Sequence, residues 1–150
     1  MNNIIASGIQ RNSGYLARVE IDKIISEAKN KDALRLEPFG FKVYSQSDED
    51  GIIEEIFRRL GIEQGIFLEI GVENGLECNT LYLLHKGWCG YWIEGNSSQR
   101  DSIITKFRSL IDKKRLGVVF SLVYPENFNH IYDGLSFYEG GPDFVSIDID

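Results

Sequence analysis

A glycine-containing turn at residues 69–75 is the segment of this chain best suited to chemistry. It has the sequence Glu-Ile-Gly-Val-Glu-Asn-Gly. Its first residues form the end of the apolar run 66–72, which is typical of a buried strand. Gly71 and Gly75 carry little side-chain bulk, so backbone N–H groups can approach a ligand closely, with Asn74 beside them. The turn therefore predicts a ligand site at the end of a strand.

The spacing within the turn separates two cofactor classes. A dinucleotide site needs the pattern G-x-G-x-x-G, because a pyrophosphate must lie against bare backbone. The position two after Gly71 is Glu73, whose carboxylate would repel a pyrophosphate but would suit the sulfonium and amino groups of S-adenosylmethionine. Glu69 adds a second acid at the strand end. S-adenosylmethionine is therefore favoured, and an NAD-type dinucleotide-binding oxidoreductase is the alternative.

A further acid, Glu94, ends the predicted strand 90–94 and is followed by Gly95. An acid at the tip of this strand can accept hydrogen bonds from both ribose hydroxyls of a bound nucleoside. This supports a nucleoside ligand without choosing between cofactors, so Glu94 and Gly95 are candidate cofactor-binding residues. An exposed strand-end acid without a ligand is the alternative.

Residues after the third predicted strand lie where an adenine ring would bind. Tyr124 is placed to line the ring, and Glu126 or Asn127 to hydrogen-bond its edge. Pro125 equally suits a turn that starts a helix, because proline is common at a first helical position. The sequence favours neither explanation over the other.

Asp148 and Asp150 lie at the end of the last predicted strand and, two residues apart, share one side of it. Carboxylates there could hold a hydroxylated acceptor, act as a general base or bind a divalent cation. A solvated strand end is the alternative. No third metal ligand is visible, so a metal is not favoured, and Asp148 is the candidate catalytic residue.

Strands that alternate with helices must position these residues. This pattern predicts an α/β fold with a Rossmann-like parallel sheet, strand order 3-2-1-4, and helices on its faces. Helices are expected at 21–36, 47–60, 79–86, 97–114 and 126–135, and strands at 66–72, 90–94, 116–123 and 144–149. In the second helix, Ile52, Ile53, Ile56, Phe57 and Leu60 form the expected apolar stripe, and Gly61 ends it.

Composition and charge exclude several function classes. The chain has 150 residues and a formal net charge of −7, which argues against a nucleic-acid or anionic-membrane partner. No apolar stretch suits a membrane span or a signal peptide, so a cytoplasmic protein is expected. Cys78 and Cys89 are too few for a disulfide framework and are expected to be small apolar side chains. A homo-oligomer is neither indicated nor excluded.

The two ends of the chain differ in character. Residues 1–42 are expected to form a helical extension ahead of a cofactor-binding domain at 43–150. The last strand, 144–149, looks like an interior strand, yet the sequence stops directly after it. A doubly wound sheet needs further strands, so we expect the domain to be incomplete and the chain truncated.

Several segments in register resemble the FkbM-type methyltransferases. The resemblance covers about residues 43–150. The matching segments are Tyr44-Ser45-Gln46, Glu49-Asp50, Phe67-Leu68-Glu69-Ile70-Gly71, Asn74-Gly75, Asn79-Thr80, Gly87-Trp88-Cys89-Gly90, Trp92-Ile93-Glu94, Pro125-Glu126-Asn127 and Ser146-Ile147-Asp148-Ile149-Asp150.

This resemblance implies a class I Rossmann-like fold and O-methylation of a sugar or other small hydroxylated metabolite by S-adenosylmethionine. It further implies that Glu69, Gly71 and Gly75 hold the methionine part of the cofactor, Glu94 the ribose, and that Asp148 faces the methyl group or acceptor. The acceptor pocket is then expected beyond Asp150. A truncated binding module without activity is a second alternative.

Overall fold

The computed structural model describes residues 2–137 and 140–149, and the described chain forms two compact units, one up to Phe39 and one from Gly40 onward. The first unit contains helix α1 (Asn2–Lys31) and the short 3₁₀ helix η1 (Glu37–Phe39). Helix α1 is longer than expected towards the N-terminus, and it ends before residue 36. The carboxylate of Asp32 accepts a hydrogen bond from the Leu34 N–H and so turns the chain there. No helix among the described residues has the length and apolar character to cross a bilayer.

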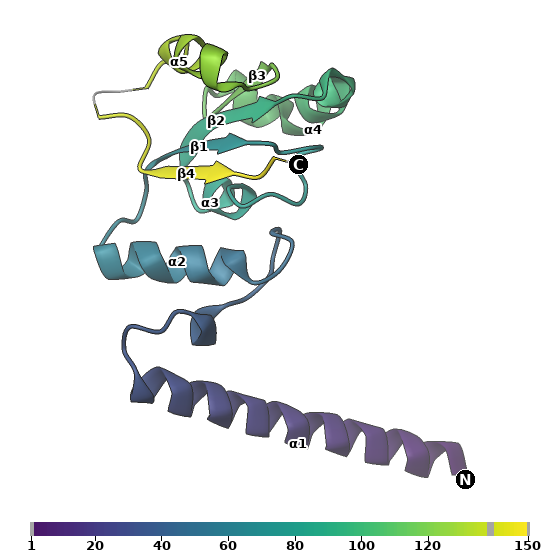
Figure 1. Cartoon of the computed structure of the whole chain (residues 1–150). Coiled ribbons are helices and arrows are strands. Elements are labelled where there is room, and N and C mark those ends of the chain that lie inside the picture. Colours follow the sequence, from purple (N-terminus) through teal and green to yellow (C-terminus); the bar gives the residue numbers. More distant parts are fainter. Residues whose placement is uncertain (1, 138–139, 150) are drawn as a thin grey trace. The chain divides into compact units, whose positions relative to one another are not determined.

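A parallel four-stranded sheet forms the centre of the second unit. Its strands are β1 (Ile66–Ile70), β2 (Cys89–Glu94), β3 (Leu116–Phe120) and β4 (Phe144–Ile147). They pair in the order β3-β2-β1-β4, as expected from the sequence, and β1 lies between β2 and β4 (Figure 1). All four carboxyl ends therefore meet at one edge of the sheet.

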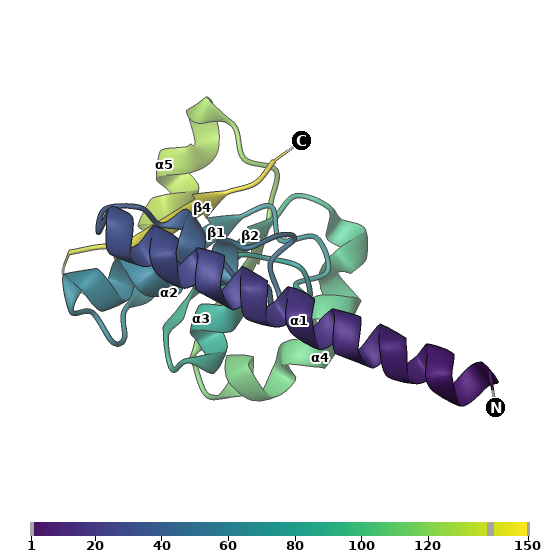
Figure 2. The same ribbon diagram turned by 90° about the horizontal axis from the view of Figure 1, so that it is seen from below.

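Helices cover both faces of this sheet. Side chains from α2 (Glu49–Leu60), α3 (Leu81–His85) and α4 (Arg100–Asp112) pack on one face, and α5 (Pro125–Asp133) packs on the other. Figure 2 shows α3 and α4 on the side of the sheet opposite α5. A 3₁₀ helix, η2 (Ser97–Gln99), precedes α4. The result is a three-layer α/β unit.

The larger core lies under α2, α3 and α4. Trp92 and Phe67 are fully buried there. The Trp92 ring packs edge to face against that of Phe107, with 4.8 Å between the ring centroids. The strand period explains the division, because Phe67 and Trp92 point to this face while Leu68 and Ile93 point towards α5. Of the expected stripe of α2, Ile53 and Phe57 are buried in this core. Ile52 and Ile56 are only half-buried, and Leu60 is 64% exposed at the helix end.

Several elements are shorter than the sequence predicts. Strand β1 stops at Ile70 because Gly71 turns away with φ +82°, and β3 stops at Phe120, before the expected Val123. Helix α3 begins at Leu81 because the N–H groups of Asn79 and Thr80 are bound by the Glu69 carboxylate. The residues that leave the strands early form the loops at the carboxyl edge.

Candidate functional site

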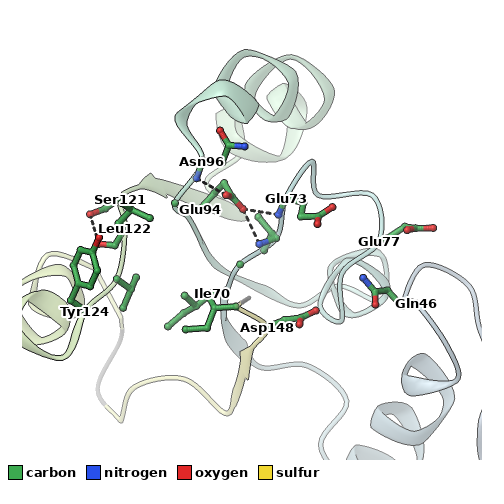
Figure 3. Close-up of a pocket in the computed structure, with 15 residues that line it drawn as sticks. Gln46, Ile70, Glu73, Glu77, Glu94, Asn96, Ser121, Leu122, Tyr124 and Asp148 are labelled. Atoms are coloured by element: carbon green, nitrogen blue, oxygen red, sulfur yellow. Dashed lines mark hydrogen bonds between the residues drawn. The ribbon is translucent and has the colours of Figure 1, made fainter.

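A cavity of about 670 Å³ lies at the carboxyl ends of the strands, where an open parallel sheet is expected to bind its ligand (Figure 3). Its volume is in the range of small-molecule sites, roughly 300–1,000 Å³. The loops after all four strands contribute to it, together with one residue from the segment before α2. The lining residues are Gln46, Ile70, Gly71, Val72, Glu73, Glu77, Glu94, Gly95, Asn96, Ser121, Leu122, Val123, Tyr124, Asp148 and Ile149.

The cavity is strongly acidic. Its described lining carries the carboxylates of Glu73, Glu77, Glu94 and Asp148 and no lysine, arginine or histidine. Carboxylates gathered without a cation favour a ligand with positive charge and disfavour a polyanion. The cavity therefore suits a cationic ligand.

Glu94 connects the loops after β1 and β2. Its side chain is 5% exposed; Oε2 accepts hydrogen bonds from the N–H groups of Val72 at 3.1 Å and Glu73 at 2.6 Å. Oε1 accepts from the Asn96 N–H at 2.6 Å. A carboxylate oxygen has two acceptor sites, so Oε1 keeps capacity for a ligand hydroxyl in the cavity. Glu94, the residue predicted to bind a ribose, thus lines the cavity, and it also fixes the shape of the glycine turn.

Glu69, which was expected to hold the methionine part of the cofactor, does not line the cavity. It is fully buried and points from β1 towards α3. Its carboxylate accepts from the Asn79 N–H, the Thr80 N–H and the Thr80 hydroxyl at 3.0, 3.0 and 2.6 Å. It also accepts from the Ser146 hydroxyl at 3.2 Å. Glu69 therefore joins β1 to the start of α3 and to β4.

The residues of the glycine turn divide into two groups. Gly71 and Glu73 line the cavity, and Glu73 adopts a left-handed backbone with φ +49°. Asn74 and Gly75 do not line it. The Asn74 side chain accepts from the Leu76 N–H at 2.9 Å and shapes the turn. Gly75 has φ +75°, and a Cβ there would lie 2.7 Å from the Trp92 ring, so this glycine serves close packing.

The loop after β3 both lines the cavity and starts a helix, the two roles between which the sequence did not decide. Tyr124 lines the cavity with a half-exposed ring and also precedes α5, which begins at Pro125. Asn127 does not line the cavity. Its Oδ1 accepts from the Tyr124 N–H at 2.7 Å, and its Nδ2 donates to the Leu122 carbonyl at 2.9 Å. Asn127 therefore holds the loop that presents Leu122 and Tyr124.

Asp148 lies at the cavity next to the end of β1. It is exposed, and its backbone N–H donates to the Ile70 carbonyl at 2.9 Å, which continues the β1–β4 pairing by one residue. Asp150, its expected neighbour on the same side, lies outside the described residues. Within residues 2–137 and 140–149, no three histidine, cysteine or acidic side chains are grouped closely enough to hold a metal ion.

Three polar lining residues were not placed at the site by sequence reasoning: Glu77, Asn96 and Ser121. Gln46 also lines the cavity, and it belongs to the Ser-Gln segment of the family resemblance, which could gate the cofactor. Asn96 has a local signal, because its side chain accepts from the Ser98 N–H as the cap of η2. Glu77 is in an irregular loop, where no periodicity indicates direction. Ser121 was expected within the strand 116–123 but lies in a loop, because β3 stops at Phe120.

The cysteine nearest the turn is unsuited to nucleophilic chemistry. Cys78 is buried behind the glycine turn and does not line the cavity. Burial raises the pKa of its thiol well above the usual range, and the Glu69 carboxylate raises it further. Because the thiolate is the reactive form, Cys78 is a small core side chain, as expected.

Comparison with solved structures supports the fold. An O-methyltransferase from Bacillus cereus in complex with SAH matches with a TM-score of 0.50 and 19% identity, over 87% of this chain and 53% of that one. SAH-bound methyltransferase PaMTH1 from Podospora anserina matches with a TM-score of 0.48 and 13% identity, over 95% and 58%. The glycopeptide N-methyltransferase MtfA complexed with sinefungin matches with a TM-score of 0.39 and 20% identity, over 51% and 34%.

This chain therefore spans between about a third and three fifths of the length of these solved proteins. At such low identity the likeness shows the fold alone, and the fold is the Rossmann-like one that the sequence predicts. No family model matches the chain, and no curated protein matches its sequence.

Proposed function

We propose that this chain is the S-adenosylmethionine-binding part of a methyltransferase. The observation that carries the proposal is the charge of the cavity: four carboxylates and no basic side chain in its described lining. S-adenosylmethionine brings a sulfonium and an amino group, both positive, and no phosphate. The O-methyltransferase from Bacillus cereus, solved in complex with SAH, agrees with this assignment.

The lining changes along the cavity as the cofactor would require. Tyr124 and Leu122 offer an apolar surface for adenine at one end, and Glu94 lies at the middle for the ribose hydroxyls. Gly71 lets the cofactor approach the backbone. The Glu73 carboxylate would lie near the positively charged sulfonium and amino groups of the cofactor. Asn74, Gly75 and Asn127 shape the loops, and Glu69 supports them from the core.

Asp148 is the proposed catalytic residue. When bound, S-adenosylmethionine would supply a methyl group that is already activated by the sulfonium. The protein then has to position a hydroxyl oxygen in line with that methyl group and to accept the hydroxyl proton. Asp148 is exposed, lines the cavity and is fixed through its backbone to Ile70, so it can accept this proton.

For the finer assignment, we propose an FkbM-type enzyme that methylates an oxygen of a sugar or other small hydroxylated metabolite. This rests on the matching segments within residues 43–150. Residues 1–42 would then be an extension outside the cofactor domain. Because the chain spans only part of its structural neighbours, a longer protein is proposed to complete the acceptor pocket.

Titration calorimetry tests the cofactor assignment. We expect SAH and S-adenosylmethionine to bind the purified chain, and NAD to bind at least about tenfold more weakly because Glu73 would face its pyrophosphate. Tighter binding of NAD would contradict the proposal and favour an oxidoreductase. Binding of SAH to both this chain and a longer one, with methyl transfer by neither, would favour a binding module instead.

A further inference from the structure

The carboxylate of the cofactor's methionine part has no obvious partner in this cavity. The described lining offers no cation, and four carboxylates surround the space. Backbone N–H groups of a glycine turn often bind such an anion, but here those of the turn residues that line the cavity are already used. The Gly71 N–H donates to the Ile93 carbonyl, and those of Val72 and Glu73 donate to Glu94. Asn74, whose N–H is not among the donors of the turn, does not line the cavity.

Two side-chain amides remain in the lining, those of Gln46 and Asn96. Asn96 follows β2, beside the proposed ribose position, and its N–H is bound by Glu94. Gln46 lies at the opposite end of the cavity from Tyr124, on the same side of Ile70 as Asp148 (Figure 3). A ligand with adenine at Tyr124 and ribose at Glu94 therefore extends its amino-acid part towards Gln46.

The segment that carries Gln46 is firmly held. One oxygen of the fully buried Asp50, Oδ2, accepts from the N–H groups of Val43, Tyr44 and Ser45 at 2.7, 2.6 and 3.0 Å. The Ser45 hydroxyl in return accepts from the Asp50 N–H at 3.2 Å. This cluster fixes the backbone directly before Gln46.

A second set of contacts holds the same segment from outside. The Tyr44 ring stacks on His85 of α3 at 5.0 Å. The Lys42 ammonium donates to the Gln46 carbonyl at 2.9 Å, which places a positive charge behind the loop. The Gln46 side chain itself is exposed and makes no hydrogen bond with any described residue. Its amide is thus presented at the cavity by a fixed loop.

From this geometry we infer that Gln46 binds the methionine carboxylate of the cofactor through its side-chain N–H₂ group. The inference rests on the proposed function and names a binding residue that lies outside the glycine turn. A neutral donor at this position lets the site hold a carboxylate without adding a cation that would repel the sulfonium. The buried Asp50 cluster acts as the support that fixes the donor.

Two ligands separate this role from a general effect on the cavity. SAH carries the amino-acid carboxylate, whereas 5′-methylthioadenosine lacks the amino-acid part. Titration calorimetry of both ligands with the native chain, Gln46→Glu and Gln46→Ala gives the comparison. Gln64→Glu is the matched control, since Gln64 is exposed just before β1, at the other end of the strand, and this change adds the same charge.

For Gln46→Glu we expect SAH binding to weaken by about tenfold or more, because a donor is replaced by a carboxylate that repels the ligand. Gln46→Ala should weaken it by about fivefold, as expected for one hydrogen bond of ordinary strength at an exposed position. Methylthioadenosine should bind both variants within about twofold of the native chain, and Gln64→Glu should change neither ligand.

Unchanged SAH binding in Gln46→Ala, or equal weakening of SAH and methylthioadenosine, would overturn the inference. If Gln46→Glu does not fold, Gln46→Ala decides by itself, because it adds no charge. Failure of the native chain to bind SAH would overturn the proposed function and with it this inference. Binding of SAH with no effect at Gln46 would overturn the inference alone.

Discussion

Gly71 follows β1, lines the cavity and packs closely against the segment after β4. A Cβ at this position would lie 1.8 Å from the Asp148 carbonyl oxygen, and Gly71 itself has φ +82°. The obstructing atom is backbone, so it can move only if β4 separates from β1. The loop that carries the proposed catalytic residue thus packs directly against the first glycine of the turn.

Gly71→Ala should therefore lower the free energy of unfolding by about 3 kcal/mol or more, through the clash and the left-handed backbone together. Gly61→Ala is the matched control. Gly61 has a similar φ of +71°, and a Cβ there would meet no atom within 4 Å beyond its chain neighbours, so only the backbone cost of about 1 kcal/mol applies. Urea denaturation of both variants measures the difference. Equal losses would show that the contact with Asp148 has no effect on stability.

At the scale of one element, α2 contains a buried carboxylate with two arginine partners. The Glu55 side chain is 5% exposed, and it bonds Arg58 at 2.6 Å and Arg59 at 2.8 Å on the next turn of the helix. Hydrogen bonding from Arg58, with Arg59 adding to it, lowers the pKa of Glu55 from 4.5 to about 2. A pKa that is lower in the folded chain stabilises the fold above the unfolded value.

Glu55→Gln should therefore lower the unfolding temperature at neutral pH, and the difference from the native chain should shrink as pH falls from about 4.5 towards 2. Glu63→Gln removes the same charge from an exposed side chain that has no ion pair with any described residue. Thermal unfolding between pH 7 and pH 3 gives the test. A difference that stays constant over this range would argue against the assigned ion pairs.

The elements differ in how far the sequence predicts them. The four strands are predicted correctly because each is a short apolar run between turn residues. Their order is also correct, because right-handed crossovers between parallel strands allow few arrangements. The ends of β1 and β3 are not predictable in this way, because backbone turns at Gly71 and after Phe120 end them. The length of α1 is not predicted either, since polar residues interrupt its apolar pattern.

The site shows the same division. The acids at strand ends are identified from their positions, but how close each one comes to the carboxyl edge depends on the pairing register. Glu69 pairs with Trp92, two residues before Glu94, so Glu69 lies within the sheet. Glu69 and Glu94 both lie near the ends of parallel strands, yet only Glu94 lines the cavity. Gln46 comes from outside the alternating strands and helices, so the strand and helix pattern does not indicate its place at the cavity. Sequence patterns locate the cavity, and packing selects its lining.

The charge of the whole molecule strengthens the charge of its cavity. The chain has a formal net charge of −7, and four of its carboxylates line one cavity with no basic side chain among the described lining residues. Fields of this kind add up in a cleft and raise the local concentration of cations. S-adenosylmethionine and SAH differ by one methyl group and one positive charge, so the pair reports this field directly.

We therefore expect S-adenosylmethionine to bind several-fold more tightly than SAH at an ionic strength of about 20 mM, and the ratio to fall towards one at about 500 mM. Titration calorimetry of both ligands across this range measures it, and SAH is the internal control because it fills the same contacts without the sulfonium charge. Salt would act equally on both ligands if the carboxylates of Glu73 and Asp148 were turned to bulk solvent in the complex. A ratio independent of ionic strength would thus contradict an acidic methyl-donor site, whatever the affinity of either ligand.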